Sequence, residues 1–342
     1  MQRVERLAYV GRSWSWLINP RWWSKYRADP SPGSVDRPIF ILGVQGGGLT
    51  LLTRMLRRHG SVVAGAGGPG YWSSADEIQN IYGPLLPLEL AGTRWKCPDH
   101  PVFSGPYSWC YGTDDMVPMY RNTAEHATDQ LRRQLQSVIG ASLAIHGASV
   151  NTPRFIDKSQ SYVLRVSMIA KLLDGQDPRF VLLTRDPYVS VQRAAEGGAA
   201  DMARLADTVE LADRIRLCAE HWTNCMNAAL EDRHAAPSGL LTVKFEDLVA
   251  NPSRTLQEVG SHCDLEIGDH MLPQAGDTLP FGSRFRDRWY PLRPDVNDAY
   301  NNRIGAHTVR LVNELAGSTV ERLGYDVRDP NDCTIEFGET DG

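Results

Sequence analysis

A glycine-rich segment between a strand-like and a helix-like stretch has the composition of an anion-binding turn. Residues 43–50 read Gly-Val-Gln-Gly-Gly-Gly-Leu-Thr, after the apolar run 39–42 and before apolar residues at helical spacing. A strand, a glycine-rich turn and a helix N-terminus aim several backbone N–H groups at one point, where they can bind phosphate or sulfate. A turn that only needs positive φ would also use glycines, so this segment alone leaves both interpretations open.

The spacing within this segment narrows the class of anion. Gly43, Gly48 and Thr50 have the spacing of the nucleotide-triphosphate loop, but Leu49 stands where that loop has its lysine. Because that lysine contacts the β- and γ-phosphates, its replacement disfavours a nucleotide kinase or NTPase but not another phosphate-bearing ligand. The loop residues that we predict to bind the anion are Gln45, Gly46, Gly47, Gly48, Leu49, Thr50 and Leu51.

A second cationic group follows the apolar run 180–183. Arg185 comes at the carboxyl end of this predicted strand, and the next helix carries Ser190 and Arg193 one turn apart on one face. Guanidinium groups form paired hydrogen bonds with a doubly charged phosphate, so these side chains predict a phosphate site. The alternative is an exposed arginine that pairs with Asp186.

The elements that must position these residues alternate between strand and helix. Segments that are typical of strands occur at 39–42, 155–157, 180–183 and 240–245, and helical spacing is found at 51–59, 131–139 and 163–173. Continuous apolar runs are typical of parallel strands that helices cover on both faces. We therefore predict the α/β class, a three-layer sandwich with a central parallel sheet of the P-loop nucleotide-binding type. In such folds ligands bind at the carboxyl ends of the strands.

Composition excludes several classes of protein. Of 342 residues, 42% are hydrophobic and 23% are charged, which excludes disordered and collagen-like chains. Thirty-six Lys and Arg against forty-one Asp and Glu give a net charge of −5, so no nucleic-acid partner is expected. No run of apolar residues is long enough for a transmembrane segment. The six cysteines form no CxxC pair and no zinc spacing, so we predict no metal, reduced thiols and a cytoplasmic location.

Five stretches, in order along the chain, resemble the sulfotransferase family, whose members use 3′-phosphoadenosine 5′-phosphosulfate as the donor. The matching stretches are 40–52 (5′-phosphosulfate loop), 157–162 ([DE]K[ST]PxY), 179–193 (3′-phosphate element, RFxxLxRDPxxxxxS), 244–252 (YEDLxxDP) and 286–292 with the closing segment to 325. The resemblance covers about residues 37–327.

The resemblance implies roles for individual residues. It implies that Lys158 lies beside the phosphosulfate and that Arg185, Ser190 and Arg193 bind the 3′-phosphate. Arg193 stands where the family has a serine, and a guanidinium keeps an anion donor there. The C-terminal residues implied to close over the 3′-phosphate or the adenine are Arg286, Arg288 and Trp289.

One loop position departs from the family in a way that bears on activity. Gly46 stands where the family has Arg or Lys, which neutralises charge on the bridging oxygen as the sulfate leaves. Loss of one such donor costs on the order of 10²–10³ in rate. We expect Lys158 to supply the missing charge. The alternative is a catalytically impaired module of the same fold, which binds 3′-phosphoadenosine 5′-phosphate without turnover.

Sulfuryl transfer also needs a base for the acceptor's proton. The candidates are Glu77 and His100, both in segment 61–122, which we predict to form a lid on the acceptor side of the sheet. The aromatic side chains of this segment suit a sugar or aromatic acceptor, and they suit ordinary packing equally well.

The rest of the chain divides into an arm, residues 1–36, one α/β domain, 37–327, and a tail, 328–342. The arm interleaves aromatic residues with Arg and Lys. It lacks a clean helical stripe, so we expect its indoles to pack on the domain, with contact to a membrane surface as the alternative. The predicted function is transfer of a sulfuryl group to a hydroxyl or amine of an unidentified small-molecule, glycan or lipid acceptor.

Overall fold

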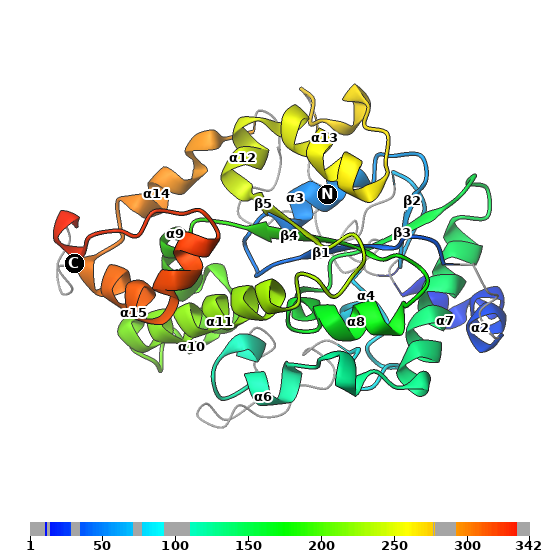
Figure 1. Ribbon diagram of the computed structural model, residues 1–342, viewed down its shortest axis with the longest axis horizontal. Coiled ribbons are helices and arrows are strands. Elements are labelled where there is room, and N and C mark those ends of the chain that lie inside the picture. The colour runs from blue at the N-terminus through cyan, green and yellow to red at the C-terminus, as the bar shows by residue number, and fades with distance from the viewer. Residues whose placement is uncertain are drawn as a thin grey trace.

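A five-stranded, all-parallel sheet forms the centre of the molecule (Figure 1). This computed structural model describes residues 11, 14–28, 35–70, 77–91, 110–275, 277 and 292–333. In spatial order the strands are β2 (Val62–Ala64), β3 (Arg154–Asp157), β1 (Ile39–Leu42), β4 (Arg179–Thr184) and β5 (Leu240–Lys244). The predicted α/β class and four of these strands are confirmed. The strand β2 was not predicted, because its three residues are fewer than the about four to eight by which a buried strand is recognised.

Each strand contributes side chains to two cores, because successive residues of a strand point to opposite faces of the sheet. Ile39 and Ile41 of β1 belong to the core beneath α3 (Leu49–Leu56), α12 (Phe245–Ala250) and α13 (Pro252–Cys263). Phe40 and Leu42 belong to the opposite core. The helices of that face are α7 (Asp129–His146), α8 (Val166–Leu172), α9 (Pro187–Arg193), α11 (Leu211–Glu231) and α15 (Ala306–Arg322). Figure 1 shows α12 and α13 on one side of the sheet and α8 and α11 on the other, so the predicted three layers are confirmed.

The remaining helices are short. They are η1 (Ser15–Ile18), α2 (Pro20–Arg27), α4 (Ile78–Ile81), η2 (Cys110–Gly112), α6 (Val117–Tyr120), η3 (Ala124–His126), η4 (Gln160–Leu164), η5 (Ala194–Gly198), α10 (Ala200–Leu205), η6 (Asp269–Met271), η7 (Pro294–Asn297), α14 (Asp298–Asn301) and η8 (Pro330–Asp332). The predicted helix at 163–173 is divided, since η4 ends at Leu164 and α8 begins at Val166. Along the described parts of the chain, no helix combines the length and hydropathy that crossing a membrane requires.

Part of the predicted lid contributes to the body of the domain. β2 pairs in parallel with β3, which makes it an edge strand of the sheet. Ile78, Ile81 and Tyr82 are fully buried in one of the two cores. Residues 71–76 and 92–109 of this segment lie outside the described residues.

The described part of the N-terminal arm packs on the domain, as expected. Trp16 and Trp22 are buried, and the Trp22 ring stacks between Tyr26 and Tyr82, with centroids 5.0 and 5.1 Å away. The arm nevertheless forms a helix, α2, which lies against α7. The side chain of Asn19 accepts hydrogen bonds from the first backbone N–H groups of α2, so Asn-Pro was the local signal for its start.

Candidate functional site

The glycine loop, residues 43–48, connects β1 to α3 at the carboxyl edge of the sheet. Gly46 and Gly48 have φ values of 89° and 94°, a conformation that side chains disfavour. Gly48 is the N-cap of α3 and provides no side-chain cap; a Cβ there would lie 2.4 Å from a ring carbon of Phe245. No side chain of the N-cap residue therefore competes with an anion at the N-terminus of α3.

The order of the strands determines which residues flank this loop. β1 pairs with β3 on one side and with β4 on the other, all in parallel. The residues that follow β3 and β4, Lys158 and Arg185, therefore lie on opposite sides of the glycine loop. Three segments far apart in the sequence thus meet at one edge of the sheet.

On the β3 side, two residues predicted to be catalytic form one buried ion pair. Lys158 and Glu77 are 4% and 5% exposed, and the Lys158 Nζ atom donates to Glu77 Oε1. Oε2 of the same carboxylate accepts hydrogen bonds from Gln79 Nε2 at 2.7 Å and from Asn80 Nδ2 at 2.6 Å. The charge of Lys158 is therefore compensated within the protein.

Hydrogen bonds between β3 and α4 hold this pair in place. Asp157, the last residue of β3, accepts a hydrogen bond from the backbone N–H of Ile78 and another from that of Ser159, both at 2.8 Å. Burial raises the pKa of Asp157 to about 6, although these hydrogen bonds favour its charged form. Because Glu77 directly precedes Ile78, the same bonds fix Glu77 against Lys158.

On the β4 side, Arg185 is equally buried but hydrogen-bonds to neutral oxygens. Its Nε and Nη2 atoms donate to Asn297 Oδ1 at 2.9 and 2.6 Å, and Nη1 donates to the Gly46 carbonyl at 3.0 Å. The guanidinium lies 4.7 Å from the centroid of the Phe245 ring. Burial, followed by the nearby charge of Arg193, lowers the pKa of Arg185 to about 10.

A second layer of side chains, without a predicted role, positions Arg185. Asn297 donates to Glu246 Oε1 at 2.7 Å, and the Tyr325 hydroxyl donates to Glu246 Oε2 at 3.0 Å. Glu246 lies in the 244–252 stretch, which resembles a family motif, but this resemblance did not predict its contact with Asn297. Asn297 has no neighbouring pattern in the sequence that could have identified it.

Ser190 and Arg193 lie one turn apart on α9, as predicted, but their side chains have different neighbours. The Ser190 hydroxyl donates to the carbonyl of Arg185 at 3.3 Å. The half-buried Arg193 reaches the glycine loop: a Cβ placed on Gly46 would lie 2.0 Å from its Nη1 atom. Two guanidinium groups, from Arg185 and Arg193, therefore meet the same loop residue.

The other predicted site residues fall into two groups. Thr50 is exposed, Leu49 and Gly47 are buried, and Gln45 and Leu51 are half-buried at the loop or the start of α3. Outside the described residues lie His100, Arg286, Arg288 and Trp289. Among the described side chains, no group of three or more His, Cys, Asp or Glu is placed to hold a metal ion.

Comparison with known proteins identifies the family of this chain. A family model described as "Sulfotransferase family" matches residues 38–269, which is well over half of the chain. The chain belongs to the sulfotransferase family. No curated protein matches it by sequence.

Solved sulfotransferase structures share the fold of this family member. A sulfotransferase domain from the curacin biosynthetic pathway has a TM-score of 0.50 at 15% identity and covers 86% of this chain and 99% of that one. Sulfotransferase STF9 from Mycobacterium avium has a TM-score of 0.50 at 13% identity and covers 95% of this chain and 83% of that one. At such identities the likeness concerns the fold alone.

Proposed function

We propose that this chain transfers the sulfuryl group of 3′-phosphoadenosine 5′-phosphosulfate to a hydroxyl or amine of a small-molecule, glycan or lipid acceptor. The observation that carries the proposal is the arginine side of the glycine loop. Arg185 is buried with only neutral hydrogen-bond acceptors and lies beside a second cation, Arg193. The anionic groups of the donor would relieve the repulsion between these cations, and the more buried Arg185 fits the 3′-phosphate.

The proposed reaction forms one bond to sulfur and breaks another. The oxygen or nitrogen of the acceptor attacks sulfur, and the bond from sulfur to the bridging phosphate oxygen breaks with its electrons left on that oxygen. The products are the sulfated acceptor and 3′-phosphoadenosine 5′-phosphate. Lys158 and the N–H groups of the glycine loop contact the phosphosulfate, while Arg185 and Ser190 hold the 3′-phosphate. The predicted cover over the adenine comes from Arg286, Arg288 and Trp289.

We assign the acceptor's proton to Glu77, with His100 as the second candidate. The Glu77 carboxylate is paired with Lys158 in this structure, so the ammonium group must move aside before the acceptor can approach the same oxygen. The donor's sulfate competes with Glu77 for the same ammonium group. Donor binding would then shift Lys158 toward the sulfate and leave a carboxylate oxygen free for the proton.

Gly46 favours one other candidate function, a module that binds the nucleotide without turnover. Without a basic side chain in the loop, the leaving oxygen would gain less stabilisation. A nucleotide kinase or NTPase is the weaker alternative because of Leu49. A cytoplasmic location is also a proposal, supported by the low cysteine density.

Thermal unfolding together with a transfer assay separates these functions. We expect 3′-phosphoadenosine 5′-phosphate to raise the Tm far more than ADP or ATP, and labelled sulfate to pass from the donor to at least one member of an acceptor panel. Equal Tm shifts for the three nucleotides would overturn the sulfotransferase proposal. A selective Tm shift without donor consumption would establish the binding module instead.

A further inference from the structure

The guanidinium of Arg193 occupies the space in which a side chain at position 46 would begin. A Cβ placed on Gly46 would lie 2.0 Å from Arg193 Nη1 and 2.9 Å from Cζ. Non-bonded heavy atoms are separated by about 3.5–4.0 Å at their optimum, so these positions exclude each other. A basic side chain at position 46 and Arg193 in its present position therefore cannot coexist.

A second glycine makes room for the other end of the Arg193 side chain. A Cβ placed on Gly198 would lie 2.4 Å from the Arg193 carbonyl oxygen and 3.0 Å from its Cγ atom. Gly198 ends η5, a single π-helical turn that follows Arg193 directly. Such turns are rare, and they are frequent at functional sites. Gly46 and Gly198 together leave space for one arginine that extends from α9 to the glycine loop.

We propose that Arg193 supplies, from helix α9, the cation that the family's glycine loop carries at position 46. This inference rests on the proposed function, and it gives Arg193 the part that the sequence analysis gave to Lys158. The family pattern pairs a basic residue at 46 with a serine at 193; this chain has no side chain at 46 and a guanidinium at 193. The cation is kept, although it comes from a different element.

The position of Arg193 assigns it to the 5′ end of the donor. Its guanidinium lies where a side chain of residue 46 would begin, whereas Arg185 contacts only the Gly46 carbonyl and donates its other two hydrogen bonds to Asn297. Lys158, on the far side of the loop, is paired with Glu77 and in the proposed reaction moves to the sulfate. Arg193 is therefore the cation that stabilises charge on the bridging oxygen, while Arg185 remains on the 3′-phosphate.

A ligand comparison tests this assignment without needing an acceptor. Calorimetry would measure the Kd of 3′-phosphoadenosine 5′-phosphate and of adenosine 3′-phosphate, which lacks the 5′ group. Arg193→Ser should raise the Kd of the bisphosphate about 10- to 100-fold and change the Kd of the 3′-monophosphate less than about threefold. Equal weakening of both ligands, or of neither, would overturn the inference. If the wild-type protein fails to bind the bisphosphate, the proposed function falls, and the inference with it.

A second experiment exchanges the residues at positions 46 and 193 and asks whether nucleotide affinity is restored. Gly46→Arg alone should weaken binding because the new side chain displaces Arg193, whereas Gly46→Arg with Arg193→Ser restores the family pattern and should recover most of the lost affinity. Gly175→Ala is the matched control for backbone strain: Gly175 has a φ of 80° and no atom within 4 Å of a built Cβ. The inference would be contradicted by a double variant that binds the bisphosphate no more tightly than Arg193→Ser although it is as stable as Gly175→Ala.

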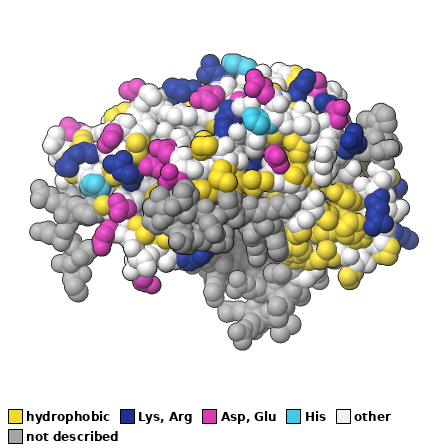
Figure 2. Space-filling view, turned by 90° about the horizontal axis from the view of Figure 1, so that it is seen from below, with side chains coloured by type: hydrophobic (Ala, Val, Ile, Leu, Met, Phe, Trp, Pro, Cys, Tyr) yellow, Lys and Arg dark blue, Asp and Glu magenta, His cyan; other side chains and the backbone are white. Residues whose placement is uncertain are grey.

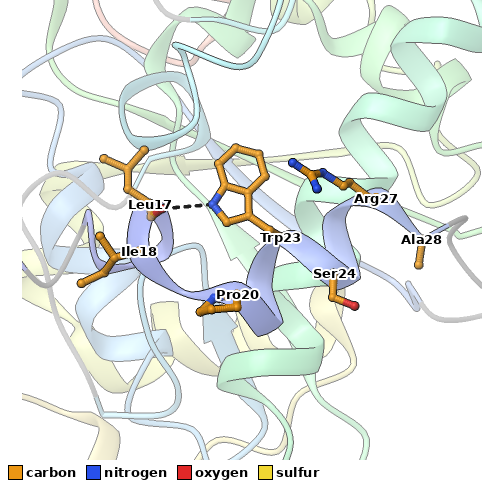
Figure 3. Close-up of a pocket in the computed structure, with 7 residues that line it drawn as sticks. All are labelled: Leu17, Ile18, Pro20, Trp23, Ser24, Arg27 and Ala28. Carbon is orange, nitrogen blue, oxygen red and sulfur yellow. Dashed lines mark hydrogen bonds between the residues drawn. The ribbon is translucent and has the colours of Figure 1, made fainter.

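A separate observation concerns the outer surface of the N-terminal arm. Leu17 and Ile18 of η1 are 48% and 86% exposed, although the arm itself is anchored by buried tryptophans. They line a hollow together with Trp23 and Arg27 (Figure 3). Figure 2 shows hydrophobic and basic side chains side by side at the end of the molecule that carries α2 in Figure 1. We call Leu17, Ile18 and the basic residues of α2 the arm surface.

The charge of the arm surface differs from that of the whole chain. Residues 11–28 contain four basic residues and no acidic residue, although the chain carries a net charge of −5. Arg21, Lys25 and Arg27 are exposed. Exposed aliphatic side chains beside an indole and several cations suit the boundary between anionic headgroups and acyl chains. We infer that the arm surface docks on an anionic bilayer.

Vesicle co-sedimentation tests this second inference. We expect the protein to bind phosphatidylcholine vesicles with about 30% phosphatidylserine at least about tenfold more strongly than vesicles of phosphatidylcholine alone. Leu17→Ser with Ile18→Ser should abolish this binding, whereas Met119→Ser, at an exposed methionine of α6, should not. Equal binding to both kinds of vesicle, or no binding, would overturn the second inference. It would also be overturned if the wild-type protein is a dimer and the Leu17→Ser, Ile18→Ser variant is a monomer.

Discussion

The two sides of the glycine loop hold buried cations in different electrostatic states. Lys158 is paired with Glu77, so the charge on the β3 side is compensated within the protein. Arg185 donates only to neutral oxygens and lies near Arg193, so no carboxylate hydrogen-bonds directly to this guanidinium on the β4 side. A bound anion therefore gains most on the arginine side, while the lysine side can exchange its internal acid for a ligand. We therefore expect the arginine side to supply most of the donor's binding energy, and the lysine side to exchange the Lys158–Glu77 ion pair for a contact with the donor.

The largest expected effect is on stability, from breaking the compensated side. Lys158→Met leaves the Glu77 carboxylate buried without its cation and should lower the free energy of unfolding by about 3–5 kcal/mol. Adding Glu77→Gln removes the orphaned charge and should recover most of this loss. Chemical denaturation measures both. A double variant as unstable as Lys158→Met would show that the two residues are not a compensated pair.

The next effect is on binding, from removing the buried arginine of the β4 side. Arg185→Met should weaken 3′-phosphoadenosine 5′-phosphate about 10²–10³-fold, because a charge-assisted contact to the 3′-phosphate is lost. Its cost in stability should be smaller than that of Lys158→Met, since no buried acid loses its partner. Calorimetry and denaturation on the same samples test this, and a larger stability loss for Arg185→Met would reverse the comparison.

The pH dependence of stability sharpens the description of the lysine side. The pKa of Asp157 is about 6 in the folded protein, above its ordinary value of 3.8. Between these values the folded protein keeps a proton that the unfolded chain has lost, so this stability is full below about pH 4 and is lost as the pH rises through 6. The free energy of unfolding relative to Asp157→Asn should therefore fall by about 3 kcal/mol over this range. A constant difference would contradict it.

The smallest expected effect comes from the second layer behind Arg185. Tyr325→Phe removes one hydrogen bond to Glu246, which positions Asn297. We expect a loss of about 1 kcal/mol in stability and only a few-fold loss in nucleotide affinity. A loss as large as that of Arg185→Met would mean that the layer is part of the binding site itself.

Much of the fold could be predicted from the sequence because its signals are local. Buried parallel strands appear as apolar runs, and a residue that follows such a strand, such as Lys158 or Arg185, must lie at the carboxyl edge of the sheet. The strand β2 is too short to give this signal. The pairing of Glu77 with Lys158 needs a chain path between them that no local pattern encodes, although both residues were candidates.

The contacts that sequence reasoning missed join residues far apart in the chain. Asn297 reaches Arg185 from the C-terminal segment, and nothing near residue 297 marks it. Gly46 and Arg193 are different, because both depart from the family pattern and both departures were visible. In the fold, Arg193 occupies the space that a side chain at position 46 would take, so one departure can compensate for the other.

The measurement that tests the central claim most directly is calorimetry of two nucleotides that differ only in the 3′-phosphate. We predict that 3′-phosphoadenosine 5′-phosphate binds the wild-type protein at least about 10²-fold more tightly than AMP, and that Arg185→Met removes this difference. Equal affinities for the two nucleotides in the wild-type protein would contradict the account.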